Sequence, residues 1–387
     1  MLDPINDDPA EVLKELGRRM QVIDLHLVGL MAQRLSIAHR VGYAKRRQAS
    51  TDKPLGADIY REDIELSRLE EVRAEAIRLG MSPEFAAGML YAMIGESCKR
   101  QMIQREQKDF SYGNVDYAQL KENLVLLAEA AASNFDDSYT SGHPATQAYM
   151  DFETRVIRGQ IEDTEHQSAA LDLGCCTGRT TFLLAEHFDR VVGVDISRPM
   201  ILRTGEKAKA AGITNLELNA VDMEDRLFWL DHADSSFDFV TMTLGTASDV
   251  RDISGVLAQI ERVLKPHGRF VLSFYNSDAL HLQAGFFPWP SSLAAVVDPS
   301  RHCLDVWVGG KSYSVYAKAE SIDGIDRLMR RRLSSTNIYT HPTMAALLPR
   351  EVMIDEHARK VIEVADRQRA ESGADDGAYI LVTGRKS

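Results

Sequence analysis

Residues 169–181 read AALDLGCCTGRTT, an apolar stretch that runs into a glycine-containing turn and then into helix-forming residues. A dinucleotide-binding loop needs the pattern G-x-G-x-x-G, but the chain supplies Gly174, Cys176 and Arg179 at those places. The phosphate-binding pattern G-x-x-x-x-G-K-S/T is also absent from the sequence. The remaining pattern is D-x-G-x-x-x-G, in which Gly174 and Gly178 keep the turn compact beside a ligand that carries no pyrophosphate.

Two acidic residues follow the next apolar stretches. Asp195 ends VVGVD, 21 residues after Gly174, and Asp222 ends LELNAVD. The carboxyl ends of parallel strands meet at one edge of a sheet, where ligands bind. We therefore expect Asp195 to accept hydrogen bonds from two ribose hydroxyls, and Asp222 to lie where an adenine amino group could be recognised.

The chain from about residue 111 to 387 alternates apolar strands with helices, after helical stretches at 116–133 and 144–161. This alternation predicts an α/β fold with a parallel, doubly wound sheet. The expected strands are AALDLG (169–174), VVGVD (191–195), LELNAVD (216–222), FDFVTMT (237–243), RFVLSFYN (269–276) and YILVTGRK (379–386), with a hairpin at 303–321 that turns at Gly309 and Gly310.

Residues 1–110 show hardly any strand signal and are expected to form a separate domain of three helices. The first extends from Ala10 to about Gln48, and at 1.5 Å per residue its length is roughly 57 Å. Because its apolar stripe is too long for a compact monomer, we expect a homodimer of intertwined first helices. A second helix is predicted from about 58 to 79, and a third, capped by Ser82, ends near residue 107.

Composition limits the classes of function. Hydrophobic residues make up 44% of the 387 residues and charged residues 26%, as in a globular protein with sizeable cores. Residues 111–387 hold 28 Lys and Arg against 39 Asp and Glu, a balance that argues against nucleic acid as a partner. No apolar run is long enough to span a membrane and no signal peptide is evident. The four cysteines show no C-x-x-C pair, so we expect free thiols, a cytoplasmic location and no metal site.

Charged and polar residues recur at helical spacing in the N-terminal region. Arg34 and Lys45 are 11 positions apart and share a helix face, and Ser97 and Gln101 form an i,i+4 pair. With the pattern D-x-x-R-E between them, the region resembles the all-helical chorismate mutase family over nearly all of residues 10–105. The matching positions are Arg34, Lys45, Asp58, Arg61, Glu62, Ser97 and Gln101.

The resemblance implies rearrangement of chorismate to prephenate without a covalent intermediate. Arg34 would clamp a carboxylate, Lys45 and Gln101 would donate to the breaking ether oxygen, and Glu62 would accept from the ring hydroxyl. The family also places an arginine seven residues before Asp24, where this chain has Gly17. Arg18 is the candidate substitute. Isochorismate pyruvate lyases use related helices, but the aspartate and glutamate of D-x-x-R-E favour a mutase.

The C-terminal region, roughly 115–387, resembles the class I S-adenosylmethionine-dependent methyltransferases. The resemblance includes the stretch ERVLKPHGRFVLSF and a reversed final strand. It implies S-adenosylmethionine as the cofactor, with Cys176 in place of a common middle glycine. The residues expected at the cofactor are Asp172, Gly174, Cys176, Gly178, Asp195, Ile196, Asp222 and Met223.

The methyl acceptor is expected to be a small molecule. The stretch TMTLGT lacks the N-P-P-Y/F motif of amide- and nucleobase-methylating enzymes. Aromatic and histidine side chains could orient or deprotonate the acceptor; they are Tyr139, His143, Tyr313, Tyr316, Tyr339 and His341.

The fusion predicts a bifunctional enzyme of aromatic or secondary metabolism whose acceptor is prephenate or an aromatic acid derived from it. Two alternatives remain for the whole chain. One is a methyltransferase with a catalytically silent helical dimerisation domain. The other is carboxy-S-adenosylmethionine chemistry that uses prephenate.

Overall fold

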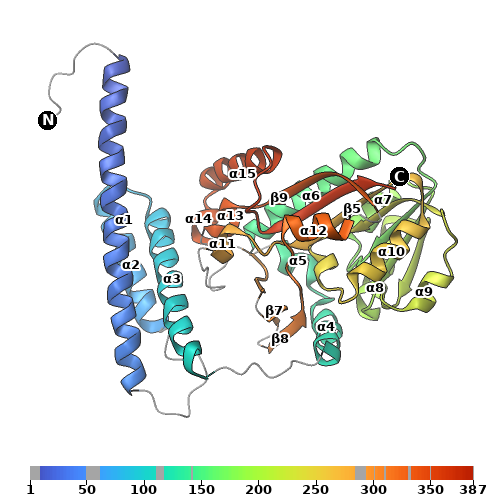
Figure 1. The fold of residues 1–387 in the computed structure, drawn as a ribbon, viewed down its shortest axis with the longest axis horizontal. Coiled ribbons are helices and arrows are strands. Elements are labelled where there is room, and N and C mark those ends of the chain that lie inside the picture. Colours follow the sequence, from blue (N-terminus) through green and yellow to red (C-terminus); the bar gives the residue numbers. More distant parts are fainter. Residues whose placement is uncertain are drawn as a thin grey trace. The chain divides into compact units, whose positions relative to one another are not determined.

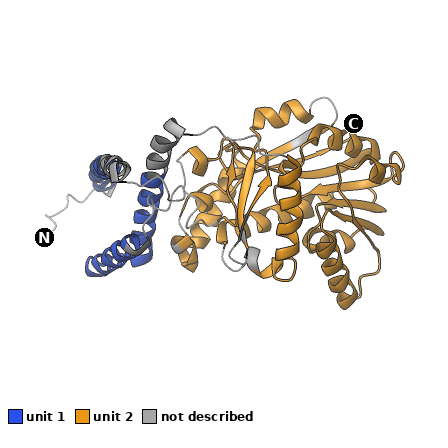
Figure 2. Cartoon of the chain, turned by 90° about the horizontal axis from the view of Figure 1, so that it is seen from below, with its two compact units in different colours: residues 1–110 blue, residues 111–387 orange. Residues whose placement is uncertain are grey.

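The computed structural model describes residues 9–48, 62–109, 117–140, 143–283, 293–299, 301–308, 311–329, 333–348 and 350–386. The chain divides into two compact units, Met1–Phe110 and Ser111–Ser387 (Figure 2). Each unit has its own architecture.

The first unit consists of helices within its described residues (Figure 1), as predicted. They are α1 (Pro9–Gln48), α2 (Glu62–Arg78) and α3 (Pro83–Asp109). With 40 residues, α1 is about 60 Å long. Gly80 has a positive φ of 71° and separates α2 from α3, and the Ser82 hydroxyl accepts a hydrogen bond from the Phe85 backbone N–H at 3.2 Å. The expected serine cap is therefore confirmed.

The second unit is built on a seven-stranded mixed sheet in the order β3-β2-β1-β4-β5-β10-β9. Strands β1 to β5 run parallel, and β10 is antiparallel to both β5 and β9. The predicted doubly wound core and reversed final strand are thus confirmed. The bounds are β1 (Ala169–Leu173), β2 (Arg190–Asp195), β3 (Leu216–Ala220), β4 (Phe237–Met242), β5 (Leu264–Tyr275), β9 (Ser334–His341) and β10 (Tyr379–Arg385).

Helices cover both faces of this sheet (Figure 1). Alternate strand residues pack on one face with α10 and α12, and on the other with α6 and α7. The helices are α4 (Tyr117–Ala131), α5 (Phe135–Thr140), α6 (Pro144–Glu162), α7 (Arg179–Ala185), α8 (Arg198–Ala211), α9 (Arg226–Leu230), α10 (Ile253–Val263), α11 (Leu280–Gln283), α12 (Ile322–Met329), α13 (Met344–Leu347), α14 (Arg350–Ile354) and α15 (Glu356–Glu371), with the 3-10 turn η1 (Thr246–Ser248).

A second, three-stranded sheet contains β6 (Val297–Asp298), β7 (Cys303–Val308) and β8 (Lys311–Tyr316). β7 and β8 are antiparallel, so the predicted hairpin is confirmed. Its expected turn at Gly309 and Gly310 lies outside the described residues. Strand β9 was not among the expected strands, because SSTNIYTH is too polar to show an apolar alternation.

Candidate active sites

The turn after β1 adopts a left-handed backbone conformation that favours glycine. Gly174 and Gly178 have φ values of 75° and 94°, in the left-handed region. A Cβ at Gly174 would lie 2.5 Å from the Thr246 side chain. Cys176, in the place of the middle glycine, also has a positive φ of 47°. Its carbonyl accepts a hydrogen bond from the Thr204 hydroxyl at 2.8 Å, which helps to hold this conformation.

Asp195, at the end of β2, binds this turn through its side chain. Its Oδ2 accepts from the Cys176 N–H at 2.9 Å, and its Oδ1 accepts from the Ser197 N–H at 2.8 Å. The side chain is buried. Burial raises the pKa of Asp195, while the two backbone N–H groups act in the opposite direction. The Cys176 side chain also bonds to this carboxylate and lowers its pKa, but the two oxygens together offer about four lone-pair sites and so have capacity for a further donor.

A cavity of about 460 Å³ lies against this turn, within the size range of small-molecule sites. Of the residues predicted at the cofactor, its lining includes Gly174, Cys176, Asp195, Ile196, Asp222 and Met223. The free lone pairs of Asp195, beside a turn without bulky side chains, suit a nucleoside with two ribose hydroxyls. The residues present therefore fit S-adenosylmethionine.

Asp172, which was expected at the cofactor, lies inside the core of the sheet domain and not in the cavity wall. It is fully buried and is not among the lining residues. Its two oxygens accept from the hydroxyls of Thr241 at 2.8 Å and Thr181 at 2.7 Å, and burial raises its pKa to about 6. Asp172 thus ties β1 to β4 and α7. Gly178 also does not line the cavity, and instead lies at the N-terminus of α7.

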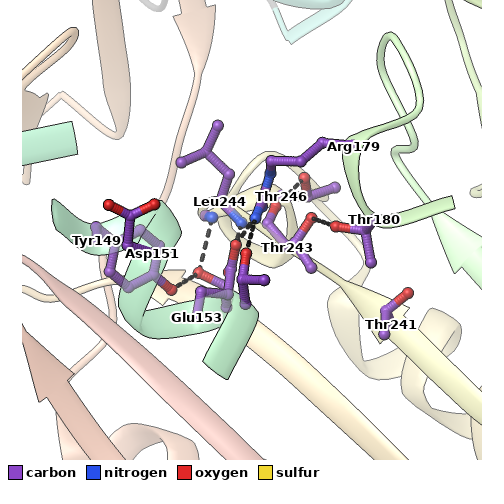
Figure 3. Close-up of polar contacts among 12 residues, drawn as sticks. Tyr149, Asp151, Glu153, Arg179, Thr180, Thr241, Thr243, Leu244 and Thr246 are labelled. Carbon is purple, nitrogen blue, oxygen red and sulfur yellow. Dashed lines mark hydrogen bonds and ion pairs between the residues drawn. The ribbon is translucent and has the colours of Figure 1, made fainter. Parts of the chain in front are cut away.

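Glu153 on α6 links the loop after β4 to the glycine turn (Figure 3). The side chain is fully buried and forms an ion pair with Arg179, the first residue of α7. Its other oxygen accepts from the Leu244 N–H at 2.8 Å. Both Arg179 and Leu244 line the cavity. Sequence reasoning missed Glu153, because its partners are 26 and 91 residues away.

Helices α4 and α5 are attached to the cavity rim by charged side chains. Lys121 on α4 forms ion pairs with Asp222 and with Glu224, the latter at 2.8 Å. Asp136 on α5 accepts from the Thr177 hydroxyl at 2.6 Å and pairs with Lys207 at 2.8 Å. The predicted adenine-binding acid, Asp222, is therefore already paired with a cation.

Apart from Lys121 and the hydroxyls of Tyr117 and Tyr316, the part of the cavity formed by α4 and the β7–β8 hairpin is apolar. Its side chains are Leu120, Leu124, Leu127, Leu304, Val306, Val315 and Tyr316. Of the residues expected to orient an acceptor, His143 and Tyr316 line the cavity. Tyr313 is not among the lining residues, and Tyr339 and His341 contact the Phe152 ring. The side chain of Tyr139 lies outside the described residues.

In the first unit, Arg34 of α1 meets Ser97 of α3. The Arg34 guanidinium donates to the Ser97 Oγ at 2.8 Å and to the Met93 carbonyl at 2.9 Å. Burial lowers the pKa of Arg34, and the nearby Glu65 carboxylate opposes this effect. None of the described carboxylates forms an ion pair with Arg34. A half-buried cation with neutral partners suits an anionic ligand.

The other predicted mutase residues are less completely described. Lys45 lies on α1, Glu62 begins α2 and Gln101 lies on α3, but the structure does not describe their side chains. Asp58 and Arg61 lie outside the described residues. Arg18 is exposed and pairs with Glu15 on its own helix.

Two family models match this chain. Residues 16–102 match chorismate mutase type II, and residues 165–312 match a methyltransferase domain. The chain therefore joins a chorismate mutase type II domain to a methyltransferase domain, two enzymatic domains in one polypeptide. The methyltransferase match also supports the prediction of S-adenosylmethionine as the cofactor.

Curated relatives match the methyltransferase part. A demethylmenaquinone methyltransferase from Bacillus velezensis is 35% identical over 115 residues, which cover 29% of this chain and 47% of the relative. A cypemycin N-terminal methyltransferase from a Streptomyces species is 40% identical over 101 residues, 25% of this chain and 38% of the relative. The chain thus spans about half the length of the first of these relatives, and less of the second.

Among solved structures, the fold is similar to a 1,6-didemethyltoxoflavin-N1-methyltransferase from Burkholderia thailandensis. The TM-score is 0.43 at 15% identity, covering 72% of this chain and 93% of that one. No described helix of the present chain combines the length and apolar character needed to cross a membrane.

Proposed function

We propose that the chain is a bifunctional enzyme that rearranges chorismate to prephenate and transfers a methyl group from S-adenosylmethionine to a small molecule. The cavity beside the glycine turn, with Asp195 in its wall, is the observation that carries the methyl transfer. S-adenosylmethionine would supply an electrophilic methyl group. The chain would bind its ribose through Asp195 and exclude water with α4 and α5.

Arg34 is the observation that supports the mutase proposal. Chorismate is a dianion, and Arg34 is a half-buried cation without a described carboxylate partner, held by Ser97 on the facing helix. Such a group orients a carboxylate in a defined geometry. Lys45 and Gln101 are proposed to stabilise the charge on the ether oxygen, with Asp58, Arg61 and Glu62 completing the pocket.

The acceptor is proposed to be prephenate or an aromatic acid derived from it. The apolar wall formed by α4 and the β7–β8 hairpin supports a ring-containing molecule. Gly17 favours a second candidate function, in which the helical unit is catalytically silent, because glycine has no side chain that could supply the charge of the family arginine.

One incubation tests the proposed function. The full chain is mixed with chorismate and S-adenosylmethionine, and every product is identified by mass. We expect loss of chorismate, appearance of its isomer or a derivative, and a product heavier by one methyl group. Unchanged chorismate together with bound S-adenosylmethionine would favour the silent helical unit.

We also propose that the chain forms a homodimer through α1. Large apolar side chains are exposed along this helix, including Leu13 (70%), Ile23 (63%) and Leu30 (61%). A second copy that brings the same stripe would cover them, because burial of apolar surface drives association.

Sedimentation of the full chain should therefore give twice its mass of 43.2 kDa. Ile23→Glu should shift the equilibrium to monomer, because a charge would be placed in the interface. Leu227→Glu, at an exposed site on α9 of the other unit, is the matched control and should remain dimeric. A monomeric wild-type protein at micromolar concentration contradicts the proposal.

A further inference from the structure

Among the buried polar atoms of the methyltransferase unit that lack a hydrogen-bond partner in the described residues, two belong to side chains in the cavity wall. They are Oδ1 of Asp249 and Nδ1 of His143, and both residues line the cavity. Buried polar groups are nearly always paired, because leaving one unpaired destabilises the folded protein. An unpaired group in the wall of a cavity is therefore a position where a ligand can supply the missing partner.

Asp249 lies at the edge of the sheet where the glycine turn lies. It follows η1, in the loop after β4, and it lines the same cavity as Cys176 of the glycine turn. Burial raises the pKa of Asp249 well above its ordinary value, so its carboxylate form is a stronger proton acceptor than that of an exposed aspartate. The carboxyl group thus lies beside the expected cofactor turn without a neutralising cation.

His143 contributes a second unpaired acceptor. Burial lowers the pKa of His143, and the charge of Arg350 lowers it further. A hydrogen bond with the Leu293 backbone raises it. The ring is therefore neutral near pH 7. Since Nδ1 has no partner, the bond to Leu293 is assigned to Nε2–H, and Nδ1 carries a free lone pair.

The cations that line the cavity are already paired. Lys121 pairs with Asp222 and Glu224, Arg179 with Glu153, and Lys207 with Asp136. The two unpaired buried atoms of the described wall, Asp249 Oδ1 and His143 Nδ1, can both accept a hydrogen bond, and they lie in a cavity that also has an apolar surface. A molecule that complements them has an apolar body and carries its own hydrogen-bond donors.

We propose that Asp249 and His143 bind the methyl acceptor, that the acceptor is an aromatic ring compound with a ring hydroxyl, and that Asp249 receives the proton of that hydroxyl. This inference rests on the proposed methyl transfer and narrows its acceptor. The hydroxyl oxygen forms the new O–CH₃ bond, and the S–CH₃ bond breaks with its electron pair retained by sulfur. The hydroxyl proton passes to the Asp249 carboxylate, leaving a methyl ether and S-adenosylhomocysteine.

Two probes and two variants of the full chain test the proposal. The probes are para-hydroxyphenylpyruvate and phenylpyruvate, which differ by the ring hydroxyl alone. The variants are Asp249→Asn, which removes the proton acceptor with little change of shape, and Asp189→Asn, the same change at an exposed site before β2. Methyl transfer is followed by product mass, S-adenosylhomocysteine binding by calorimetry, and folding by thermal melting.

We expect wild-type protein to methylate the hydroxylated probe at least about tenfold faster than phenylpyruvate. Asp249→Asn should lower that rate about 100-fold, in the range of a lost general base. It should leave S-adenosylhomocysteine affinity within about twofold and should not lower the melting temperature, because no described native hydrogen bond of Oδ1 is lost. Asp189→Asn should behave like the wild type.

Several results would overturn the inference, and they separate it from the proposed function. Equal rates on the two probes would exclude the ring hydroxyl as the methylated group. An unchanged rate in Asp249→Asn would exclude proton transfer to Asp249. If Asp249→Asn weakens S-adenosylhomocysteine binding by as much as it lowers the rate, Asp249 binds the cofactor and not the acceptor. Methylation of prephenate but of neither probe rejects the acceptor class and leaves methyl transfer standing. Failure to bind S-adenosylhomocysteine rejects the proposed function itself.

Discussion

Arg34→Ala should lower kcat/KM for chorismate at least about 100-fold, because the variant loses a charge-assisted clamp on the substrate carboxylate. Both kcat and KM should change, since the clamp acts on the bound substrate and on its reactive shape. Lys45→Ala should instead affect mainly kcat, because its proposed contact is with charge that develops during the reaction. The measurement is the steady-state loss of chorismate absorbance.

Loss of folding must be separated from loss of catalysis, because Arg34 also joins α1 to α3 through Ser97. Arg34→Lys keeps the charge but loses the planar fork, and should recover only part of the rate. Arg78→Ala, at an exposed arginine on α2 that pairs with Glu75, is the control. Arg18→Ala tests the departure at Gly17. Wild-type rates in folded Arg34→Ala would contradict the assignment.

Asp195→Ala should weaken binding of S-adenosylhomocysteine about 100-fold, since two ribose hydroxyls would lose their acceptors. The same carboxylate holds the Cys176 N–H, so the glycine turn loses a support as well. Calorimetry measures the affinity. In the proposed site the carboxylate form would accept from the ribose. Because burial raises the pKa of Asp195, wild-type affinity should start to fall at a higher pH than it would with an exposed carboxylate.

Two control variants, Asp195→Asn and Asp189→Ala, distinguish loss of a ribose contact from a general loss of folding in Asp195→Ala. The amide retains one acceptor oxygen and should bind with intermediate affinity. Asp189 lies exposed just before β2, so its replacement should leave both affinity and melting temperature unchanged. An Asp195→Ala protein that melts like the wild type and binds with wild-type affinity would remove Asp195 from the proposed site.

Much of the fold could be predicted because the central strands are apolar and bounded by turn residues. β1, β2 and β4 are almost fully buried, so their sequences carry a clear signal. β9 carries no such signal, because its residues are mostly polar. It forms a strand because it pairs with β10 from Ser334 to His341, a contact that outweighs its weak strand propensity. Its place at the sheet edge depends on a contact between distant segments.

The candidate cofactor site was partly predictable for a related reason. Gly174, Asp195 and Asp222 occupy defined places relative to strand ends, which a sequence shows directly. Asp172 follows the same pattern, yet the structure engages its oxygens with two threonines inside the core. Asp249 could have been noticed as an acid in the loop after an apolar strand. The burial of its oxygen depends on side chains that only the tertiary fold brings together.

The pairing of Lys121 with Asp222 bears on the speed of turnover. An adenine amino group that approaches Asp222 must share or displace an ammonium ion that also holds α4 to Glu224. If Asp222 binds adenine as proposed, cofactor exchange depends on the strength of this partly exposed ion pair, which dissolved salt weakens. The residence time of the demethylated product would then shorten as ionic strength rises, even where the chemical step is unaffected.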